Sequence, residues 1–188
     1  MANAPHGEAP LRADAARNRE RILQAAEVVL AEKGADASFD EIAKRAKVGI
    51  GTLYRRFPTR ESLLAAISDE RLLALSRTSL ARDDRLSPTA SIRAFAGELV
   101  DHVIHCRGLA ASLGAVMKSG TPGCHASREE ARRLLLRAQD TGAVRRDVSV
   151  DDLVCMVTAI SLAIEQDGTD PSRTSHRVDL FLDGIAAR

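Results

Sequence analysis

The sequence predicts an all-α protein, and three observations carry this prediction. Alternating β-branched stretches are scarce, and only 3% of the 188 residues are aromatic. Alanine, leucine, arginine and glutamate, which favour helices, are abundant. Apolar residues recur at intervals of three and four along most of the chain, which gives each helix one apolar face. We therefore expect three short N-terminal helices followed by a larger helical bundle.

The first predicted helix spans about residues 17–33, and Gly34 is a suitable residue to end it. Residues 1–15 are small, polar and rich in proline, so we expect a disordered arm before this helix. The second helix follows the sequence SFDEIAKRA, in which Ser38 and Glu41 have the spacing of a capping box.

A short third helix is predicted in GIGTLYRRFP, residues 49–58, after a tight break. Leu53 and Phe57 are four residues apart and are expected to face inward, with Ile50 one turn earlier on the same side. Pro58 ends this helix, because proline cannot continue the hydrogen-bonding pattern.

Thr59 is the expected cap of a long helix over residues 59–82. Ser87 and Pro88 have the pattern of an N-cap and a first helical residue, and this next helix extends to about residue 106. A shorter helix is predicted over residues 109–117. The stretch KSGTPGCHAS, residues 118–127, is expected to be a loop because of its glycines and proline.

A further helix is predicted over residues 128–142. Ser149 and Asp152 have the spacing of a second capping box, which would begin the next helix. Residues 153–164 are apolar on nearly every side, so this helix is either central or shared with another subunit. The last helix is expected to begin at residues 170–171, Asp-Pro, and it repeats apolar residues at coiled-coil-like spacing.

Composition limits the class of protein. The three cysteines are widely spaced, which argues against a disulfide framework or a zinc ribbon and for a reducing compartment. The N-terminus does not resemble a signal peptide, and no apolar run reaches the roughly 20 residues of a membrane span. We expect a cytoplasmic protein that does not bind a membrane.

The net charge of the chain is +1, but the charged residues are unevenly distributed along it. Residues 1–60 contain eleven basic and eight acidic residues, and residues 42–60 contain six basic residues and no acidic one. Three short helices with a tight turn between the second and third describe a helix-turn-helix module, in which the third helix enters the major groove of DNA. A basic patch on this module suits a nucleic-acid contact.

The third helix has an outer face suited to DNA. If Leu53 and Phe57 are buried, Thr52, Tyr54, Arg55 and Arg56 point outward or sideways. The phenol of Tyr54 can donate to a phosphate oxygen, and guanidinium groups can hold phosphates or guanine edges. Gly51, which has no side chain, would allow the helix backbone to approach the sugar-phosphate chain.

The stretch FDEIAKRAKVGIGTLYRRFPTRESLLAAI resembles the DNA-binding domain of the TetR family of bacterial transcriptional regulators, over about residues 17–73. The resemblance implies an all-helical homodimer with domain limits at residues 16–58 and 59–188. The first domain would bind operator DNA, and the second would bind a small molecule and dimerise. The N-terminal motif also resembles a subset with SbtR-like C-terminal domains. Repression is the expected action, with release by the ligand.

The resemblance also implies roles for single residues. Thr52 would lie near base edges, Arg55 in the groove, and Tyr54 and Arg56 on phosphates. Further expected DNA contacts flank this helix or lie outside it: Ser38, Lys47, Arg60 and Arg17, with Arg19 beside Arg17. Lys47 stands where many relatives have glycine, and a left-handed backbone there would cost about 1 kcal/mol.

The C-terminal half is less informative. Residues 151–187 fit the dimer-forming helices of the family, and their excess apolar surface independently suggests a second copy of the chain. The expected ligand is a small-molecule effector, and no cofactor is expected. The candidate pocket residues are mostly polar or flexible: His102, His105, Cys106, Met117, Met156 and Glu165.

Two alternatives remain open. His102, His105 and Cys106 have the spacing of one helical face, so the protein could be a metal-responsive regulator that binds zinc or copper. It could also be a helical dimer with no regulatory role. An enzyme is not expected, because adjacent Cys124 and His125 are poorly placed to act together and no phosphate-binding glycine run is present.

Overall fold

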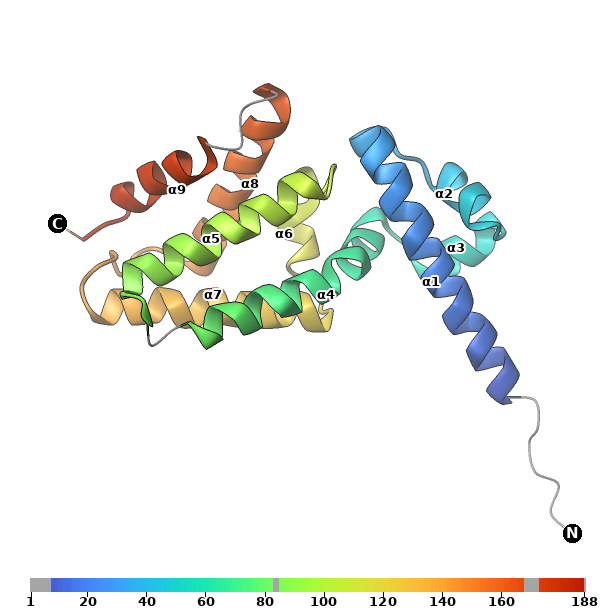
Figure 1. Ribbon diagram of the computed structural model, residues 1–188, viewed down its shortest axis with the longest axis horizontal. Coiled ribbons are helices and arrows are strands. Elements are labelled where there is room, and N and C mark those ends of the chain that lie inside the picture. The colour runs from blue at the N-terminus through green and yellow to red at the C-terminus, as the bar shows by residue number, and fades with distance from the viewer. Residues whose placement is uncertain (1–7, 83–84, 168–172, 188) are drawn as a thin grey trace, which may run out of the picture.

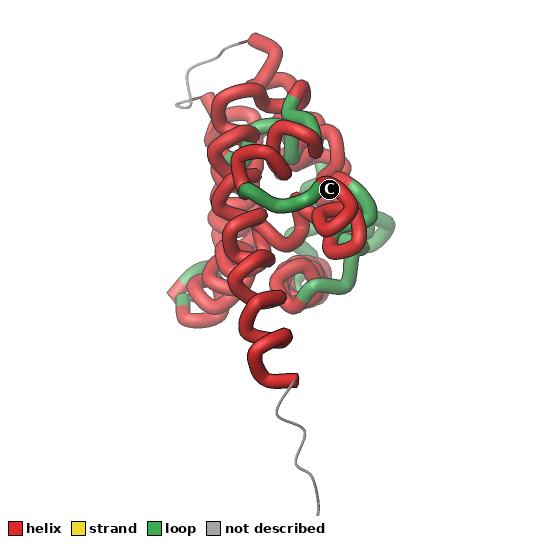
Figure 2. Tube along the Cα trace, turned by 90° about the vertical axis from the view of Figure 1, so that its right-hand side faces the viewer, coloured by secondary structure: helices red, strands yellow, loops and turns green. Residues whose placement is uncertain are grey.

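The structure, a computed structural model, describes residues 8–82, 85–167 and 173–187. These residues are helical apart from their connections (Figure 2), and they include an isolated antiparallel bridge between Val144 and Ala186 but no strand. The all-α prediction is confirmed. No helix in the described ranges is both long and apolar enough to cross a membrane.

The N-terminal unit consists of α1 (Glu8–Lys33), the 3-10 turn η1 (Gly34–Asp36), α2 (Phe39–Ala46) and α3 (Ile50–Arg56). These helices lie at one end of the elongated molecule (Figure 1). They share a small core in which Ile22, Ala26, Ile42, Leu53 and Phe57 are buried. This core determines which face of α3 is left for other contacts.

The first helix is longer than the sequence analysis predicted. It begins at Glu8, whereas we expected a helix from about residue 17 and a disordered arm over residues 1–15. Residues 1–7 lie outside the described residues. Pro10 falls in the first turn, where its missing N–H group breaks no hydrogen bond within the helix, so it permits the earlier start.

Both predicted capping boxes are present. The backbone N–H of Glu41 donates to Ser38 Oγ over 3.3 Å, and the N–H of Asp152 donates to Ser149 Oγ over 3.2 Å. In each case the acidic side chain also accepts from the N–H group of its serine. These local hydrogen bonds fix where α2 and α8 begin, as the sequence predicted.

The long helix α4 (Arg60–Ala81) connects the two halves of the molecule (Figure 1). Thr59 caps it as predicted, and its 22 residues span about 33 Å. One end of α4 contacts α1, and the rest lies along α7 (Pro122–Asp140) in the C-terminal bundle. A tilt of α4 against α7 would therefore move the N-terminal unit.

The C-terminal bundle contains, besides α7, the helices α5 (Pro88–His105), η3 (Ala110–Ser112), α6 (Leu113–Val116), α8 (Val150–Asp167) and α9 (Arg173–Gly184). Ser87 caps α5 and Pro88 is its first residue, as predicted. Residues 170–171, predicted to begin the last helix, lie outside the described residues.

Two predicted boundaries in the bundle are wrong. The helix expected over residues 109–117 is divided into η3 and α6. The loop expected over residues 118–127 is shorter, because Thr121 caps α7 and Pro122 begins it. This is the cap-and-proline pattern already recognised at residues 87–88, but the glycines on either side of it favoured a loop.

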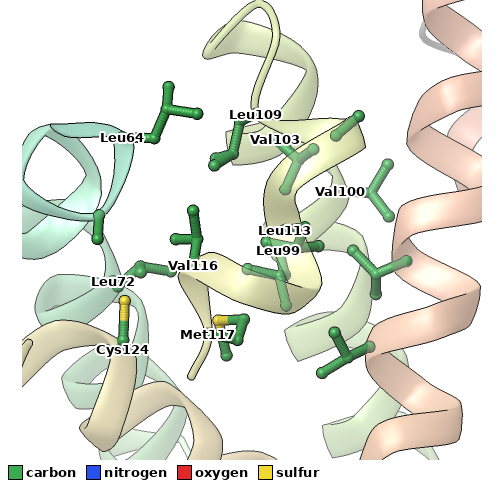
Figure 3. Packing of buried hydrophobic residues seen from close by; sticks show 14 of the residues in the cluster. Leu64, Leu72, Leu99, Val100, Val103, Leu109, Leu113, Val116, Met117 and Cys124 are labelled. Atoms are coloured by element: carbon green, nitrogen blue, oxygen red, sulfur yellow. The ribbon is translucent and has the colours of Figure 1, made fainter. Parts of the chain in front are cut away.

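The segment from η3 to α6 fills the centre of the bundle (Figure 3). Its apolar side chains pack between α4, α5 and α7 in one buried cluster. The labelled members are Leu113 and Val116 from this segment, Leu109 and Met117 from either side of it, Leu64 and Leu72 from α4, Leu99, Val100 and Val103 from α5, and Cys124 from α7. The short helices therefore lie between the long helices α4 and α8, which they contact.

The last two helices leave apolar surface uncovered. On α8, Leu153, Val157 and Ile160 are buried, whereas Cys155 and Ala159 on the opposite face are exposed. On α9, Leu180 is 59% exposed. The described residues leave these faces uncovered, which is consistent with the hypothesis of a second subunit.

Candidate nucleic-acid interface

The third helix is anchored as the sequence predicted at two of three positions. Leu53 and Phe57 are buried in the N-terminal core. Ile50, which we expected on the same buried side, is 38% exposed, so that prediction is wrong. A helical side chain lies over the turn that precedes it, and Ile50 is the first residue of α3, where no such turn exists.

The opposite face of α3 carries its polar and basic side chains. Tyr54 is 52% exposed, and Arg55 and Arg56 are also exposed. The Tyr54 ring packs on Phe39 of α2, with ring centroids 5.1 Å apart and an interplanar angle of 44°. This aromatic contact fixes the direction of the phenol while leaving it in solvent.

Basic side chains of α1 and α3 gather around one concavity. Its lining includes Arg19, Thr52, Arg55 and Arg56. Arg55 Nη2 lies 3.4 Å from Thr52 Oγ1, a weak hydrogen bond that keeps both groups on one side of α3. Within the described ranges Arg55 and Arg56 form no ion pair, so their charge is available to an anionic partner.

Other predicted DNA-contact residues have partners within the chain. Ser38 is engaged in its capping box, and the Arg17 guanidinium pairs with the Asp14 carboxylate on the exposed face of α1. Arg60 is turned toward the protein: its guanidinium donates to the carbonyl oxygens of Ala37 over 2.7 Å and of Gly34 over 3.1 Å. Arg60 therefore secures the end of α1, and we leave it out of the proposed DNA contacts below.

Gly51 is exposed, and a Cβ atom added there would have no neighbour within 4 Å in the described chain. No neighbour among the described residues therefore requires glycine at this position. The absence of a side chain leaves room for a partner that approaches α3 from outside.

Lys47 forms the tight turn between α2 and α3. Its backbone is left-handed, with φ 53° and ψ 46°, and its carbonyl oxygen accepts a hydrogen bond from Arg21 Nη2 over 3.3 Å. Arg21 is not among the residues predicted from the sequence, because this contact joins residues that are far apart in the chain.

Replacing Lys47 with glycine should raise the free energy of unfolding by up to about 1 kcal/mol, because glycine adopts this conformation without strain. Urea denaturation monitored by circular dichroism measures the change. Lys44→Gly is the matched control: Lys44 is exposed inside α2, and the same substitution there should lower stability by about 1 kcal/mol. A loss of stability in Lys47→Gly would contradict the strained turn.

The C-terminal bundle contains an apolar cavity between α5, α7, α8 and α9. Of the six predicted pocket residues, only Met117 and Met156 line it. Glu165 lies beyond it near the end of α8, where the Gly108 N–H group and Arg107 approach its carboxylate. The sequence predicted an apolar pocket with a few polar groups, and this cavity is apolar but does not include the four polar candidates His102, His105, Cys106 and Glu165.

His102, His105 and Cys106 do not form a metal site. Cys106 caps the end of α5, where its N–H group donates to the carbonyl oxygen of His102 over 3.1 Å. Burial raises the pKa of the Cys106 thiol to about 11, which disfavours the thiolate that a metal needs. In the part of the chain described, no three metal-binding side chains come together.

His102 is largely buried, and its Nε2 atom has no hydrogen-bond partner among the described residues. Burial, together with the charges of Arg71 and His105, lowers the pKa of His102 to about 4. The folded protein therefore keeps this ring neutral between pH 6.5 and 4, where the unfolded chain binds a proton.

Acidification should weaken the fold through His102. The neutral His102 ring makes its full contribution to the free energy of unfolding above pH 6.5. This contribution, about 3 kcal/mol, is lost as the pH falls to 4. Urea denaturation at pH 7 and pH 4.5 should show a smaller loss for His102→Gln than for the wild type. His105→Gln is the control, since His105 is exposed. Equal losses in all three proteins would contradict the role of His102.

Comparison with known proteins agrees with this geometry. Residues 22–67 match the family described as bacterial regulatory proteins of the tetR family, and residues 87–187 match the SbtR-like C-terminal domain of transcriptional regulators. The HTH-type transcriptional regulator AqdR of Rhodococcus erythropolis is 28% identical over 98% of this chain and 93% of its own length. An uncharacterized HTH-type transcriptional regulator of Mycobacterium bovis is 31% identical over 68% of this chain and 82% of its own.

A solved structure shows the same fold. The TetR transcriptional regulator SCO0520 of Streptomyces coelicolor is 31% identical and superimposes with a TM-score of 0.53, over 90% of this chain and 98% of that protein. These relatives are regulators rather than enzymes. Because both halves match and the helix-turn-helix is intact, the chain belongs to the TetR family of bacterial transcriptional regulators and is a DNA-binding protein.

Proposed function

We propose that the protein is a ligand-responsive repressor that binds a pseudo-palindromic operator as a homodimer in the cytoplasm and is released by a small molecule. The observation that carries this proposal is the outer face of α3. There Tyr54, Arg55 and Arg56 are exposed together on a helix whose other side is fixed by Leu53 and Phe57. A rigid helix with exposed donors is what recognition of the major groove requires.

The residues of α3 divide into two kinds of contact. Thr52 and Arg55, which share one side of the helix, are assigned to base edges, where an arginine can bind guanine with two hydrogen bonds. Tyr54 and Arg56 are assigned to phosphates, which position the protein without reading the sequence. Gly51 allows the backbone to come close, in agreement with the open space at its Cβ position.

Three further residues are assigned to the margins of the interface. Lys47 is exposed in the turn before α3 and forms no ion pair within the described residues. Ser38 begins α2, where its hydroxyl is still exposed, and Arg17 lies on the exposed side of α1. We expect smaller contributions from these side chains, because Arg17 and Ser38 already have partners in the chain.

A homodimer formed through residues 151–187 would place two recognition helices about 34 Å apart, which is one turn of DNA. The exposed faces of α8 and α9 support this assignment, since Cys155, Ala159 and Leu180 are otherwise left in water. Sedimentation of the protein with and without operator tests it. Operator binding by a single subunit would contradict the dimer.

Two connections can carry a signal between the halves. The first is α4, which is continuous from Thr59 to the bundle and is held to α7 where Gly123 N–H donates to Asp69 Oδ1 over 2.6 Å. The second is Arg107, whose Nη1 donates to the carbonyl oxygen of Ala31 at the end of α1 over 3.1 Å. A ligand that shifts these contacts would couple to operator affinity by typically about 1–3 kcal/mol.

The proposal is tested by selecting genomic DNA fragments bound by the purified protein and measuring their affinity by fluorescence anisotropy at several salt concentrations. A sequence-specific regulator should bind selected fragments at least about 10³-fold more tightly than random DNA. Binding with a steep salt dependence but no selectivity would indicate a non-specific DNA-binding protein. No binding at all would leave a helical dimer without a regulatory role, and either result overturns the proposal.

A further inference from the structure

The cavity in the C-terminal bundle has an unusual lining, because every side chain around it is apolar. It is bounded by α5, α7, α8 and α9 and by the residue after α6. The lining residues are Ile92, Phe95, Ala96, Leu99, Met117, Ala131, Leu134, Leu153, Val154, Met156, Val157, Ile160, Val178 and Phe181. None of them has a charge or a strong hydrogen-bonding group in its side chain.

The backbone offers no substitute for the missing polar groups. All the lining residues except Met117 belong to helices, where N–H and C=O groups bond along the helix, and the Met117 N–H group donates to the carbonyl oxygen of Leu113 over 2.8 Å. A hydroxyl or amide group buried in such a site loses its bonds to water without replacement, and a carboxylate loses far more. The four polar residues that we expected in a pocket, His102, His105, Cys106 and Glu165, all lie outside this lining.

The cavity is small in the present structure. Its volume is about 20 Å³, which is room for one water molecule, and its apolar lining favours a dry space. Ala96, Met156 and Phe181 are only partly buried and mark the side that faces solvent. Met117 and Met156 have unbranched, flexible side chains that can move to enlarge the space for a ligand.

We infer that the effector of the proposed regulator is an uncharged molecule whose buried part is hydrocarbon, and that it binds in this cavity. The inference rests on the proposed function and adds the chemistry of the ligand. Occupancy must widen the cavity and push its walls apart. One wall contains Ala131 and Leu134 of α7, the helix that holds α4 through Gly123 and Asp69, so this displacement reaches the helix that carries the DNA-binding unit.

Toluene and benzoate are suitable probes, because they share a ring and differ in charge. The melting temperature of the full chain should rise by about 3–6 °C in toluene at roughly tenfold its dissociation constant. Benzoate at the same concentration should produce no shift. An equal or larger shift with benzoate, or no shift with either toluene or the larger naphthalene, overturns the inference.

Two substitutions locate the binding site. Ala131→Leu fills the cavity from α7, and Ala96→Leu fills it from its solvent side, where a larger side chain is more easily tolerated. Either variant, if helical by circular dichroism, should lose the toluene shift. Ala74→Leu is the matched control on the exposed side of α4 and should keep it. Retention of the shift in Ala96→Leu and Ala131→Leu would place toluene elsewhere and overturn the inference.

Measurements of operator binding and of melting distinguish a failure of this inference from a failure of the proposed function. Selective DNA binding without ligand tests the regulator alone, and the melting experiments require no DNA. If the protein binds DNA selectively and toluene raises its melting temperature, toluene should also weaken operator binding about 5–150-fold in the wild type and not in Ala96→Leu. Toluene binding with unchanged operator affinity would show that the cavity is not the effector site.

Discussion

Replacing Gly123 with alanine should lower the melting temperature of the protein by roughly 5–10 °C, which corresponds to a destabilisation of about 2–3 kcal/mol. The cause is the close approach of α4 and α7. A Cβ atom at position 123 would lie 2.8 Å from Asp69 Oδ1 and inside the contact distance of the Asp69 backbone carbonyl group. Backbone cannot rotate away as a side chain can, so the two helices must separate.

Separation of α4 from α7 also breaks polar contacts nearby. The hydrogen bond from Gly123 N–H to Asp69 Oδ1 is 2.6 Å long, and the buried hydroxyl groups of Ser76 and Ser127 lie 3.1 Å apart further along the same pair of helices. A buried hydroxyl without a partner costs about 1–3 kcal/mol, so the destabilisation should fall toward the upper end of the range.

Gly97→Ala is the matched control for this prediction. Gly97 lies inside α5, and a Cβ atom there would have no neighbour within 4 Å in the described chain. Because alanine favours the helix more than glycine, Gly97→Ala should stabilise the protein by about 0.5–1 kcal/mol. If thermal denaturation gave Gly123→Ala the same gain as Gly97→Ala, the tight contact of α4 and α7 would be wrong.

The sequence predicted those parts of the fold that depend on neighbouring residues. The capping boxes of Ser38 and Ser149 each involve residues three apart, so their hydrogen bonds could be predicted from spacing alone. The buried positions of Leu53 and Phe57 follow from helical periodicity in the same way. The sequence also indicated Lys47 as the position of a left-handed backbone in the turn before α3, and Lys47 has that conformation in the structure.

The features that were missed depend on residues far apart in the chain. Arg60 binds the carbonyl groups of residues 34 and 37 only because α1 ends beside the start of α4. The cavity takes its lining from four helices, so a polar cluster within one helix, such as His102 and His105, did not locate it. Local spacing contains no information on either arrangement.

Operator affinity should respond most strongly to Arg55. If Arg55 binds a base edge, Arg55→Ala costs about 1–3 kcal/mol per recognition helix, and a homodimer carries the substitution twice. Operator binding is therefore expected to weaken by about 2–6 kcal/mol, with reduced discrimination at the base pair that Arg55 reads. Fluorescence anisotropy on the selected operator and on single-base variants measures both effects.

The adjacent arginine should behave differently if it binds phosphate. Arg56→Ala should weaken binding to all sequences equally and reduce the slope of log affinity against log salt by about 1 for each phosphate that is no longer neutralised. Arg77→Ala is the control for both substitutions, because Arg77 is exposed on α4 away from α3. Operator affinity and its salt dependence should be unchanged in Arg77→Ala.

Tyr54→Phe completes this series, because it removes one hydroxyl group and keeps the ring that packs on Phe39. The folded structure should be unaffected, so any decrease in affinity reports on the phenol alone, at about 0.5–1.5 kcal/mol per recognition helix. Surface substitutions at positions 55 and 56 should likewise change stability by no more than about 0.5 kcal/mol. If Arg55→Ala, Arg56→Ala and Tyr54→Phe all bound operator as the wild type does, the exposed face of α3 would not be the DNA-binding surface.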